Sequence, residues 1–461
     1  MAVLAAFMVP HPPMIVPEIG RGSEKQIAET IRAYEQVADE IAALEPETIV
    51  ITSPHTVMYA DYFHISPGRK AKGSFAAFRA PQVTFREEYD EELADRICLE
   101  AMEEKFPAGT MGERDASLDH GTMVPLWFIR KKYPAGKIVR AGLSGLPLTD
   151  HYRFGMLIRD AVEKLGRKAV FVASGDLSHK LQTYGPYGFA PEGPEYDRRI
   201  MEDAGSGLFG RLLDYDETFC EKAAECGHRS FVIMAGALDG KKVRVKKLSH
   251  QDVTGVGYGI CTFYPEGEDE ERRFLKIHLE KLEEKLAEQT AGADPYVKLA
   301  RLSLETYIRE GHRLRLPEGL PEEMTKEKAG VFVSIHKHGK LRGCIGTIAP
   351  VTGSIAQEII RNAVSAAVED PRFDPITEDE LKWLEINVDV LGRPEKIASM
   401  DELDVKRYGV IVTSGYRRGL LLPDLDGVDT PRQQVSIALQ KGGIRESEHY
   451  QMERFEVIRH R

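Results

Sequence analysis

The sequence predicts an α/β N-terminal domain with a mostly parallel central sheet, followed by a smaller α+β C-terminal domain. Two observations predict the first domain. Short runs rich in Val, Ile, Phe and Ala alternate with amphipathic segments up to about residue 264, and each run is only a few residues long. Such runs are typical of strands buried on both faces of a parallel sheet. A third observation, paired apolar runs mixed with helical segments after residue 293, predicts the α+β domain.

The elements of the first domain follow from local signals. Ser23–Glu24–Lys25–Gln26 has the form of a capping box and predicts the start of a helix whose apolar face includes Ile27, Ile31, Tyr34, Ala38 and Ile41. The pattern then predicts, in order, a strand at 48–55, a polar loop near 66–88, a helix over 88–104, a strand at 137–142, a helix over 151–165, a strand at 168–173, helices over 194–213 and 216–238, and strands at 242–248 and 256–264.

A change of composition divides the chain. We expect a first domain at 1–264, a charged helical linker at 265–292 that is dense in Glu and Lys, and a second domain at 293–461. The second domain is predicted to contain a helix over 295–311, a hairpin with a turn at Gly339–Lys340, a helix over 353–369 that ends before Pro371, strands at 384–391 and 409–413, a helix near 430–441, and a last strand at 454–459.

Composition narrows the class of protein. The 461 residues are 42% hydrophobic and 29% charged, with a net charge of -11, which argues against a nucleic-acid partner. Five unpatterned cysteines favour a reducing cytoplasm. The first apolar run lacks a preceding basic region, and no run approaches the roughly 18 residues of a membrane span, so we expect a cytoplasmic protein without a membrane partner.

Three of the apolar runs end in histidine: VLAAFMVPH at His11, TIVITSPH at His55 and AVFVASGDLSH at His179. Ligands of open parallel sheets collect beyond the carboxyl ends of the strands. We therefore expect these imidazoles to share a site, with His11 and His55 as nitrogen ligands of a metal. A third ligand would leave coordination positions open for water, dioxygen or a substrate. Glu225 and Cys226 are the candidates, with His228 a further one, although the segment also fits an ordinary helix end.

Two further histidines carry features of reaction chemistry. Asp176 and His179 lie three residues apart after a strand, so the carboxylate is expected to orient the imidazole of a general base, unless Asp176 only caps a turn. His120 follows Asp119 at a predicted helix N-terminus, where the helix dipole favours the neutral imidazole. A neutral ring can donate a hydrogen bond to a bound oxygen, although His120 also fits a structural role.

In the second domain, Cys344 lies in LRGCIG between two glycines. Arg342 next to the thiol favours a reactive thiolate. The alternative is a small buried cysteine, with Arg342 paired to a carboxylate. His336 and His338 are two residues apart in a predicted strand, which fits either a metal pair or an exposed edge.

These motifs carry a resemblance that covers nearly the whole chain. His11-Pro12-Pro13, Ser53-Pro54-His55, Asp119-His120-Gly121 and the SGDLSH run at 174–179 resemble, in order and spacing, the motifs of the class III extradiol dioxygenase superfamily, which includes LigB-type catalytic subunits and Memo proteins. LRGCIG, EDPRF, GLLLP and RFEVI of the second domain resemble the family named after the AMME chromosomal region gene. The two-domain order is similar to that of the AmmeMemoRadiSam system protein A family.

The resemblance implies a non-haem metal-dependent oxidoreductase in which Fe(II) activates dioxygen and a catechol-like aromatic diol. His11 and His55 match the two histidine ligands of that family, and His179 matches its acid/base, with Asp176 and His120 in support. The third position departs from the family's glutamate, because Cys226–Gly227 resembles the Cys–Gly of Memo proteins while Glu225 is adjacent. A thiolate is softer than a carboxylate and would also admit copper or zinc.

Two alternatives to a ring-cleaving enzyme remain. One is a metal-binding or redox partner of a radical-SAM protein, without ring-cleavage activity, as the name of the two-domain family implies. The other is a zinc hydrolase that uses the same histidines. The sequence leaves open whether the chain forms a homo-oligomer.

Overall fold

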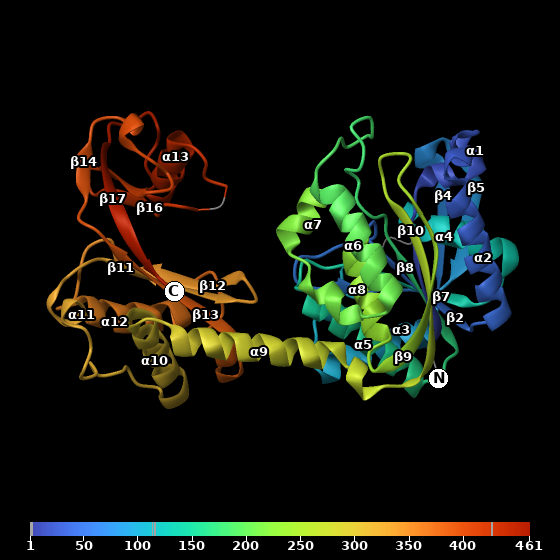
Figure 1. The fold of residues 1–461 in the computed structure, drawn as a ribbon, viewed down its shortest axis with the longest axis horizontal. Helices are drawn as coiled ribbons and strands as arrows, with labels where there is room; N and C mark the ends of the chain where they lie inside the picture. Colours follow the sequence, from blue (N-terminus) through green and yellow to red (C-terminus); the bar gives the residue numbers. More distant parts are fainter. Residues whose placement is uncertain (1–2, 113, 115–116, 426) are drawn as a thin grey trace. The chain divides into compact units, whose positions relative to one another are not determined.

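The computed structural model describes residues 3–112, 114, 117–425 and 427–461. The chain divides into two compact units, Met1–Leu279 and Glu280–Arg461, and helix α9 (Phe274–Gly292) crosses the boundary (Figure 1). Each unit has its own hydrophobic clusters. Within the described residues, no helix has both the length and the hydropathy needed to cross a membrane.

A six-stranded sheet forms the centre of the first unit. Its order is β7-β2-β8-β1-β10-β9, with β7, β2, β8 and β1 parallel and the last two strands antiparallel. The bounds are β1 (Val3–Val9), β2 (Thr48–Ser53), β7 (Lys137–Gly142), β8 (Ala169–Ser174), β9 (Lys241–Gln251) and β10 (Tyr258–Glu268). The N-terminal domain is therefore α/β with a mostly parallel sheet, as the sequence predicts.

Helices cover both faces of this sheet, because its strands are apolar on both sides. Along β1, Ala6 and Met8 join one hydrophobic cluster, whereas Ala5, Phe7 and Val9 join the other. This period of two is what a doubly buried strand requires. The helices are α1 (Pro17–Gly20), α2 (Ala28–Leu44), α3 (Glu91–Glu103), α4 (His120–Lys132), α5 (Leu148–Lys164), α6 (Glu192–Ser206), α7 (Glu217–Ala223) and α8 (His228–Ala237).

Two N-terminal predictions were wrong in detail. Residues 66–88, predicted as a polar loop, contain the antiparallel pair β4 (Lys70–Phe75) and β5 (Ala80–Glu88), whose alternate side chains are buried. The Ser23 capping box does not form, because the Ser23 hydroxyl donates to the Gly20 carbonyl and α2 begins at Ala28 after a 3₁₀ turn. The short pair β3 (Phe63–His64) and β6 (Ala108–Gly109) completes the unit.

The helix predicted over 216–238 is two helices, α7 and α8, separated by residues 224–227. Ala224 takes a positive φ of 53° at the end of α7, so the chain turns out of the helix there. The turn places Cys226 beside the loop that follows β8, where the two backbones lie very close. A Cβ built on Gly175 would lie 2.1 Å from the Cα of Gly227, so only glycine fits at this contact.

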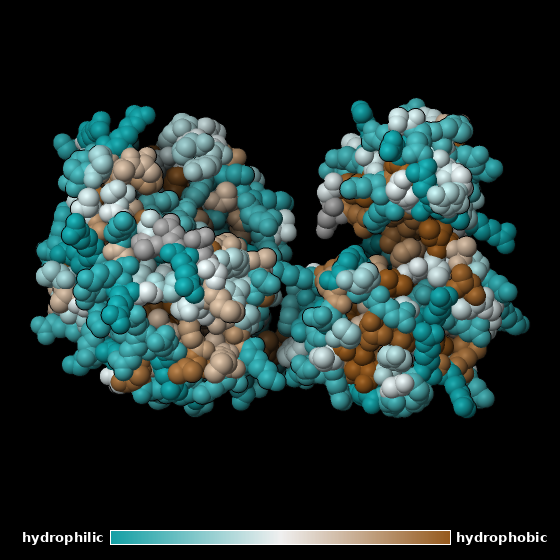
Figure 2. All heavy atoms as spheres, turned by 180° about the vertical axis from the view of Figure 1, so that it is seen from behind, coloured by the Kyte–Doolittle hydropathy of each residue, from teal (hydrophilic) through white to brown (hydrophobic). Residues whose placement is uncertain are grey.

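The second unit is an antiparallel curled sheet with helices, which agrees with the predicted α+β class. Its strand order is β12-β11-β13-β17-β15-β16, with β14 paired to β17. The turn between β11 and β12 is His338–Gly339, both at positive φ, so His338 lies outside the strand and does not share a face with His336 as predicted. On the face of this unit shown in Figure 2, hydrophobic residues gather in the notch between its upper and lower parts.

The bounds of this unit's elements are α10 (Pro295–Glu310), α11 (Glu322–Lys326), β11 (Val331–Lys337), β12 (Lys340–Gly346), α12 (Ile355–Val368), β13 (Leu384–Leu391), β14 (Glu395–Ile397), β15 (Tyr408–Ser414), β16 (Arg417–Leu421), α13 (Pro431–Lys441) and β17 (Gln451–His460). Helices α10 and α12 pack on one face of the sheet through Val331, Val333 and Ile335 of β11. The opposite face of β11, which carries Phe332, Ser334 and His336, does not contact these two helices.

Candidate metal centre

Strand order explains why distant histidines meet. Strands β1 and β2 flank β8 in the sheet, and all three run in the same direction. His11 and His55 each follow their strand by two residues, and the 174–179 segment continues from β8 between them. All three segments therefore leave the same edge of the sheet, at the carboxyl ends of the strands.

Three side chains offer ligand atoms to a common point. The Nε2 atoms of His11 and His55 are 3.0 Å apart, and the Cys226 Sγ lies 3.6 Å from the His11 Nε2. All three donor atoms lie within 4.8 Å of one another. His11 is buried, Cys226 is partly buried and His55 is exposed, so the group opens to solvent on the His55 side.

Hydrogen bonds fix the imidazole of His11 for metal binding. The Ser174 hydroxyl donates to the Gly121 carbonyl at 2.5 Å, so its oxygen accepts from the His11 Nδ1, 3.0 Å away. This arrangement holds the proton on Nδ1 and leaves the Nε2 lone pair directed at His55 and Cys226. Ser174 was missed in the sequence, although a hydroxyl side chain at the last position of the buried β8 was the available signal.

The break between α7 and α8 places Cys226 in the group. The Asp176 backbone N–H donates to the Cys226 Sγ at 3.3 Å, and the Cys226 N–H donates to the Asp176 carbonyl at 3.4 Å. The close contact between Gly175 and Gly227 holds the same two loops together. The sulfur is thus positioned by backbone on both sides, and it already accepts one N–H as a thiolate ligand would.

The neighbouring candidates Glu225 and His228 are directed elsewhere. The Glu225 carboxylate accepts from the His228 backbone N–H at 2.6 Å and so caps the start of α8. The buried His228 ring uses both nitrogens, with Nε2 2.9 Å from the Leu212 carbonyl and Nδ1 3.3 Å from the Tyr196 hydroxyl. Of the candidates for the third ligand, the structure brings only Cys226 to His11 and His55.

Asp176, His179 and Cys226 form a second group with ligand atoms within 4.8 Å of one another. The Asp176 carboxylate accepts from the His11 backbone N–H at 2.7 Å, and no described hydrogen bond joins it to His179, contrary to the expected orienting contact. The His179 ring stacks on Tyr187, with centroids 4.9 Å apart. Its Nε2 is buried without a hydrogen-bond partner among the described residues, so one ring nitrogen is left without a described hydrogen bond.

His120 lies at the first turn of α4, where Asp119 is the N-cap and accepts from the Thr122 N–H at 3.0 Å. The His120 ring centroid is 4.0 Å from that of His55 and 5.4 Å from that of His11. The Ser53 hydroxyl donates to Asp119 at 2.6 Å, which ties the end of β2 to the helix. The sequence predicts the helix N-terminus at which His120 lies.

Burial and crowding keep these imidazoles neutral. Desolvation, together with the nearby His55, His120 and His179, holds the pKa of His11 well below 6.5. Burial lowers the pKa of His120 to about 4, with His55 adding to the effect, and the same two causes lower the pKa of His179 to about 4. At neutral pH the rings therefore offer free lone pairs, as metal binding or proton abstraction requires.

This donor set fits a metal ion with an open coordination sphere. Two neutral imidazole nitrogens and one sulfur give three ligands, and three-ligand sites leave positions for exogenous groups. Burial raises the pKa of the Cys226 thiol well above 9, and the nearby Asp176 and Glu225 carboxylates add to this. The buried thiol therefore keeps its proton until a cation displaces it.

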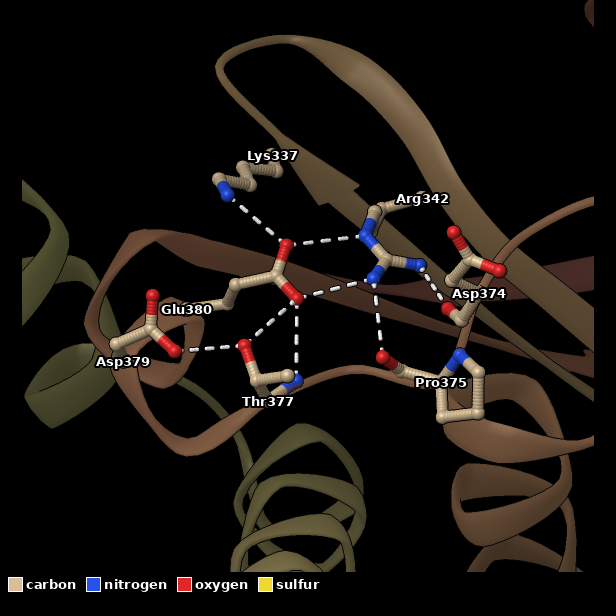
Figure 3. A network of polar contacts seen from close by, with 7 residues as sticks. All are labelled: Lys337, Arg342, Asp374, Pro375, Thr377, Asp379 and Glu380. Atoms are coloured by element: carbon tan, nitrogen blue, oxygen red, sulfur yellow. Dashed lines mark hydrogen bonds and ion pairs between the residues drawn. The ribbon is translucent and has the colours of Figure 1, made fainter. Parts of the chain in front are cut away.

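The motif residues of the second unit have a different arrangement. Arg342 forms a two-point ion pair with Glu380, at 3.0 and 2.9 Å, and donates to the Asp374 carbonyl at 2.7 Å (Figure 3). Its guanidinium is therefore engaged away from the Cys344 thiol, as in the carboxylate-paired alternative. The Cys344 Sγ instead accepts from the Ser334 hydroxyl at 3.2 Å.

Two family models match the chain. Residues 5–261 match the family described as the catalytic LigB subunit of aromatic ring-opening dioxygenase, and residues 297–460 match the AMMECR1 family.

Two relatives and one solved structure are similar to this chain. Protein CA_C1420 of Clostridium acetobutylicum is 43% identical over 472 residues and covers 100% of both chains. A protein of Thermotoga maritima is 48% identical over 172 residues, which are 37% of this chain and 99% of its own. The crystal structure of uncharacterized protein PH0010 from Pyrococcus horikoshii is similar over 36% of this chain and 88% of its own, with 30% identity and a TM-score of 0.34.

Proposed function

Because this chain belongs, through residues 5–261, to the family of the catalytic LigB subunit of aromatic ring-opening dioxygenases, we propose that its first unit is a non-haem metal-dependent oxidoreductase. Its metal is Fe(II), and its substrate is an aromatic diol of the catechol class. The observation that supports this most is the group His11, His55 and Cys226, with ligand atoms within 4.8 Å. His179 shares a second such group with Cys226, and its buried Nε2 has no hydrogen-bond partner among the described residues.

In this proposal His11, His55 and Cys226 hold the ion, and Fe(II) bound there supplies the activation of dioxygen towards the diol. His179 accepts the proton of a diol hydroxyl on its Nε2 and later returns it. Its pKa of about 4 keeps the ring neutral before the reaction and makes the protonated ring short-lived. His120, also neutral, donates a hydrogen bond to negative charge that develops on oxygen.

The test begins with metal analysis of protein purified without oxygen, followed by oxygen uptake with a panel of catechols. We expect about one iron per chain and catechol-dependent uptake. Cys226→Ser should lose most of the metal, whereas Glu225→Gln, its matched neighbour, should keep it. Iron-loaded protein that consumes no oxygen with any catechol would contradict ring cleavage, and stoichiometric zinc with ester or amide hydrolysis would favour the hydrolase instead.

His179 gives a second, independent test. We expect His179→Ala to keep its metal and to lose ring-opening activity by about 100-fold or more, because general base catalysis contributes roughly that much. Loss of metal in this variant would mean that His179 is a ligand and would contradict the assigned role.

One observation favours a second candidate function. The Cys226 Sγ lies 3.6 Å from the His11 Nε2, whereas the Glu225 carboxylate is directed into a helix cap, so the third ligand in this proposal is a soft sulfur. A thiolate-containing site suits copper or a redox-handling role as well as iron. In that case the chain would serve as a metal-binding redox partner of a radical-SAM protein. Copper retention together with absent oxygen uptake would favour this candidate.

A further inference from the structure

The second unit contains a cavity of about 640 Å³ that the proposed metal chemistry does not use. Strands β11, β12, β13 and β17 supply one wall, and the β16 end with α13 supplies the other. Side chains alternate between the two faces of β11, so every second residue of this strand lines the cavity. Phe332, Ser334 and His336 face the cavity, while the alternating Val331, Val333 and Ile335 are buried against α10 and α12.

Register brings polar groups together on this wall. Ser334 lies opposite Cys344 on β12 and Asn387 on β13, and all three line the cavity. The Ser334 hydroxyl donates to the Cys344 Sγ at 3.2 Å. No hydrogen bond between described residues involves the His336 ring or the Asn387 side-chain amide. The cavity wall therefore presents an imidazole and an amide whose hydrogen-bonding capacity is unused.

The charged residues around the cavity are mainly cationic. Four cationic side chains line it, Arg372, Arg418, Lys441 and Arg459, against the two carboxylates Asp389 and Asp424. Three of the cations already have an acidic partner, with Asp370 bound to Arg372, Glu453 to Arg418 and Asp389 to Arg459. Lys441 forms no ion pair with any described residue. Among the described residues, the positive charge of Lys441 at the cavity therefore has no acidic partner.

The remaining lining is apolar. Leu341 and Ile348 extend from the β12 side, and Leu420, Leu422 and Leu425 extend from β16 and the segment after it. Leu341 is 38% exposed, so part of this apolar lining is accessible to a ligand. Apolar walls with a few convergent polar groups are typical of small-molecule sites.

We propose that this cavity binds a small organic anion, with an apolar body against the leucines and a carboxylate or phosphate group directed at Lys441, Asn387 and His336. The anion places its charge near Lys441, which has no acidic partner among the described residues, and its body lies against the leucines. Cys344 lies within the site and reports its occupancy, because a bound molecule shields the thiol from reagents.

The test measures alkylation of Cys344 in the full-length protein. Iodoacetamide reacts as the thiolate displaces iodide, and peptide mass spectrometry quantifies the product at each cysteine. Phenyl phosphate, benzoate and the neutral benzamide serve as the three competing compounds. At about ten times the dissociation constant, a bound anion should slow alkylation of Cys344 roughly tenfold, because only the free protein reacts. Alkylation of Cys98, in the first unit, should not change.

The variants identify the cation. We expect Lys441→Gln to weaken protection by the anions about fivefold, since an exposed charge pair contributes at most that much. Arg432→Gln, which removes an exposed cation from the same helix outside the cavity, should leave protection unchanged. Stronger protection by phenyl phosphate or by benzoate identifies the anionic group. Equal protection by benzamide, or no protection by either anion, would overturn the proposal.

Discussion

At the scale of single residues, the candidate metal centre depends on one serine as much as on its ligands. Ser174 accepts the Nδ1–H of His11 while it donates to the Gly121 carbonyl. Such partners of metal-binding histidines fix the tautomer and the orientation of the ring. The ring of His11 therefore meets a cation with the correct lone pair already in place.

Removing that hydroxyl should weaken metal binding without removing a ligand. We expect Ser174→Ala to raise the dissociation constant for Fe(II) or Zn(II) by about 10- to 100-fold. Competition with a chelating dye under anaerobic conditions measures the constant. Ser303→Ala deletes an equally buried hydroxyl that donates to the Ile360 carbonyl in the other unit, and it should leave the constant unchanged. An unchanged constant in Ser174→Ala would mean that the tautomer is set by other groups.

The Cys226 thiol predicts proton release. Burial holds its pKa well above 9, so the metal-free protein carries the proton at neutral pH and metal binding must displace it. Calorimetry in two buffers of different ionisation enthalpy should therefore show about one proton released per ion bound. Cys226→Ser should release about one proton fewer with whatever metal it still binds. Equal release in the two proteins would show that the sulfur is not a ligand.

At the scale of elements, the ion-pair network around Glu380 joins the β11–β12 hairpin to the segment before β13 (Figure 3). Burial alone would raise the pKa of this carboxyl, but hydrogen bonds from Arg342 and Lys337 lower it to about 2. A carboxyl with a lowered folded pKa stabilises the protein above its usual pKa, near 4.5, and loses that contribution as pH falls towards 2.

We therefore expect Glu380→Gln to lower the free energy of unfolding of the second unit by about 1.5–3 kcal/mol at pH 6, the range for hydrogen bonds to charged groups. The difference from the wild-type protein should shrink as the pH falls from 4.5 towards 2. Urea unfolding followed by circular dichroism at several pH values measures it. Glu378→Gln, in the same 3₁₀ segment but largely exposed, should have a small effect at every pH. A pH-independent difference for Glu380→Gln would contradict the assignment.

The elements also show what the sequence could and could not predict. Buried parallel strands were predictable because apolar residues predominate on both of their faces, and this placed His11, His55 and His179 at one edge. The β4–β5 hairpin was missed because only alternate residues, such as Ala71 and Phe85, are buried. The break at 224–227 was missed because Ala224 favours helix locally, and the close contact of Gly175 with Gly227 depends on tertiary packing. The choice between Cys226 and Glu225 depends on that break.

At the scale of the whole molecule, the two compact units have separate cores, and the candidate ligands all lie in the first. A ligand that binds only the folded first unit stabilises that unit alone. Scanning calorimetry should therefore show two transitions, of which metal shifts one. The gain should be about 2.7 kcal/mol at a free metal concentration 100 times the dissociation constant. A single transition, or an equal shift of both, would contradict independent units.

The backbone contact between the loops after β8 and after α7 has a consequence for directed evolution. Saturation mutagenesis of codons 175 and 227 should return almost exclusively glycine, because the methyl group of an alanine at either position would clash with the neighbouring chain. Selection for altered metal preference in this scaffold will therefore succeed by exchanging the sulfur at position 226 or its neighbours and not by remodelling the loop junction that carries it.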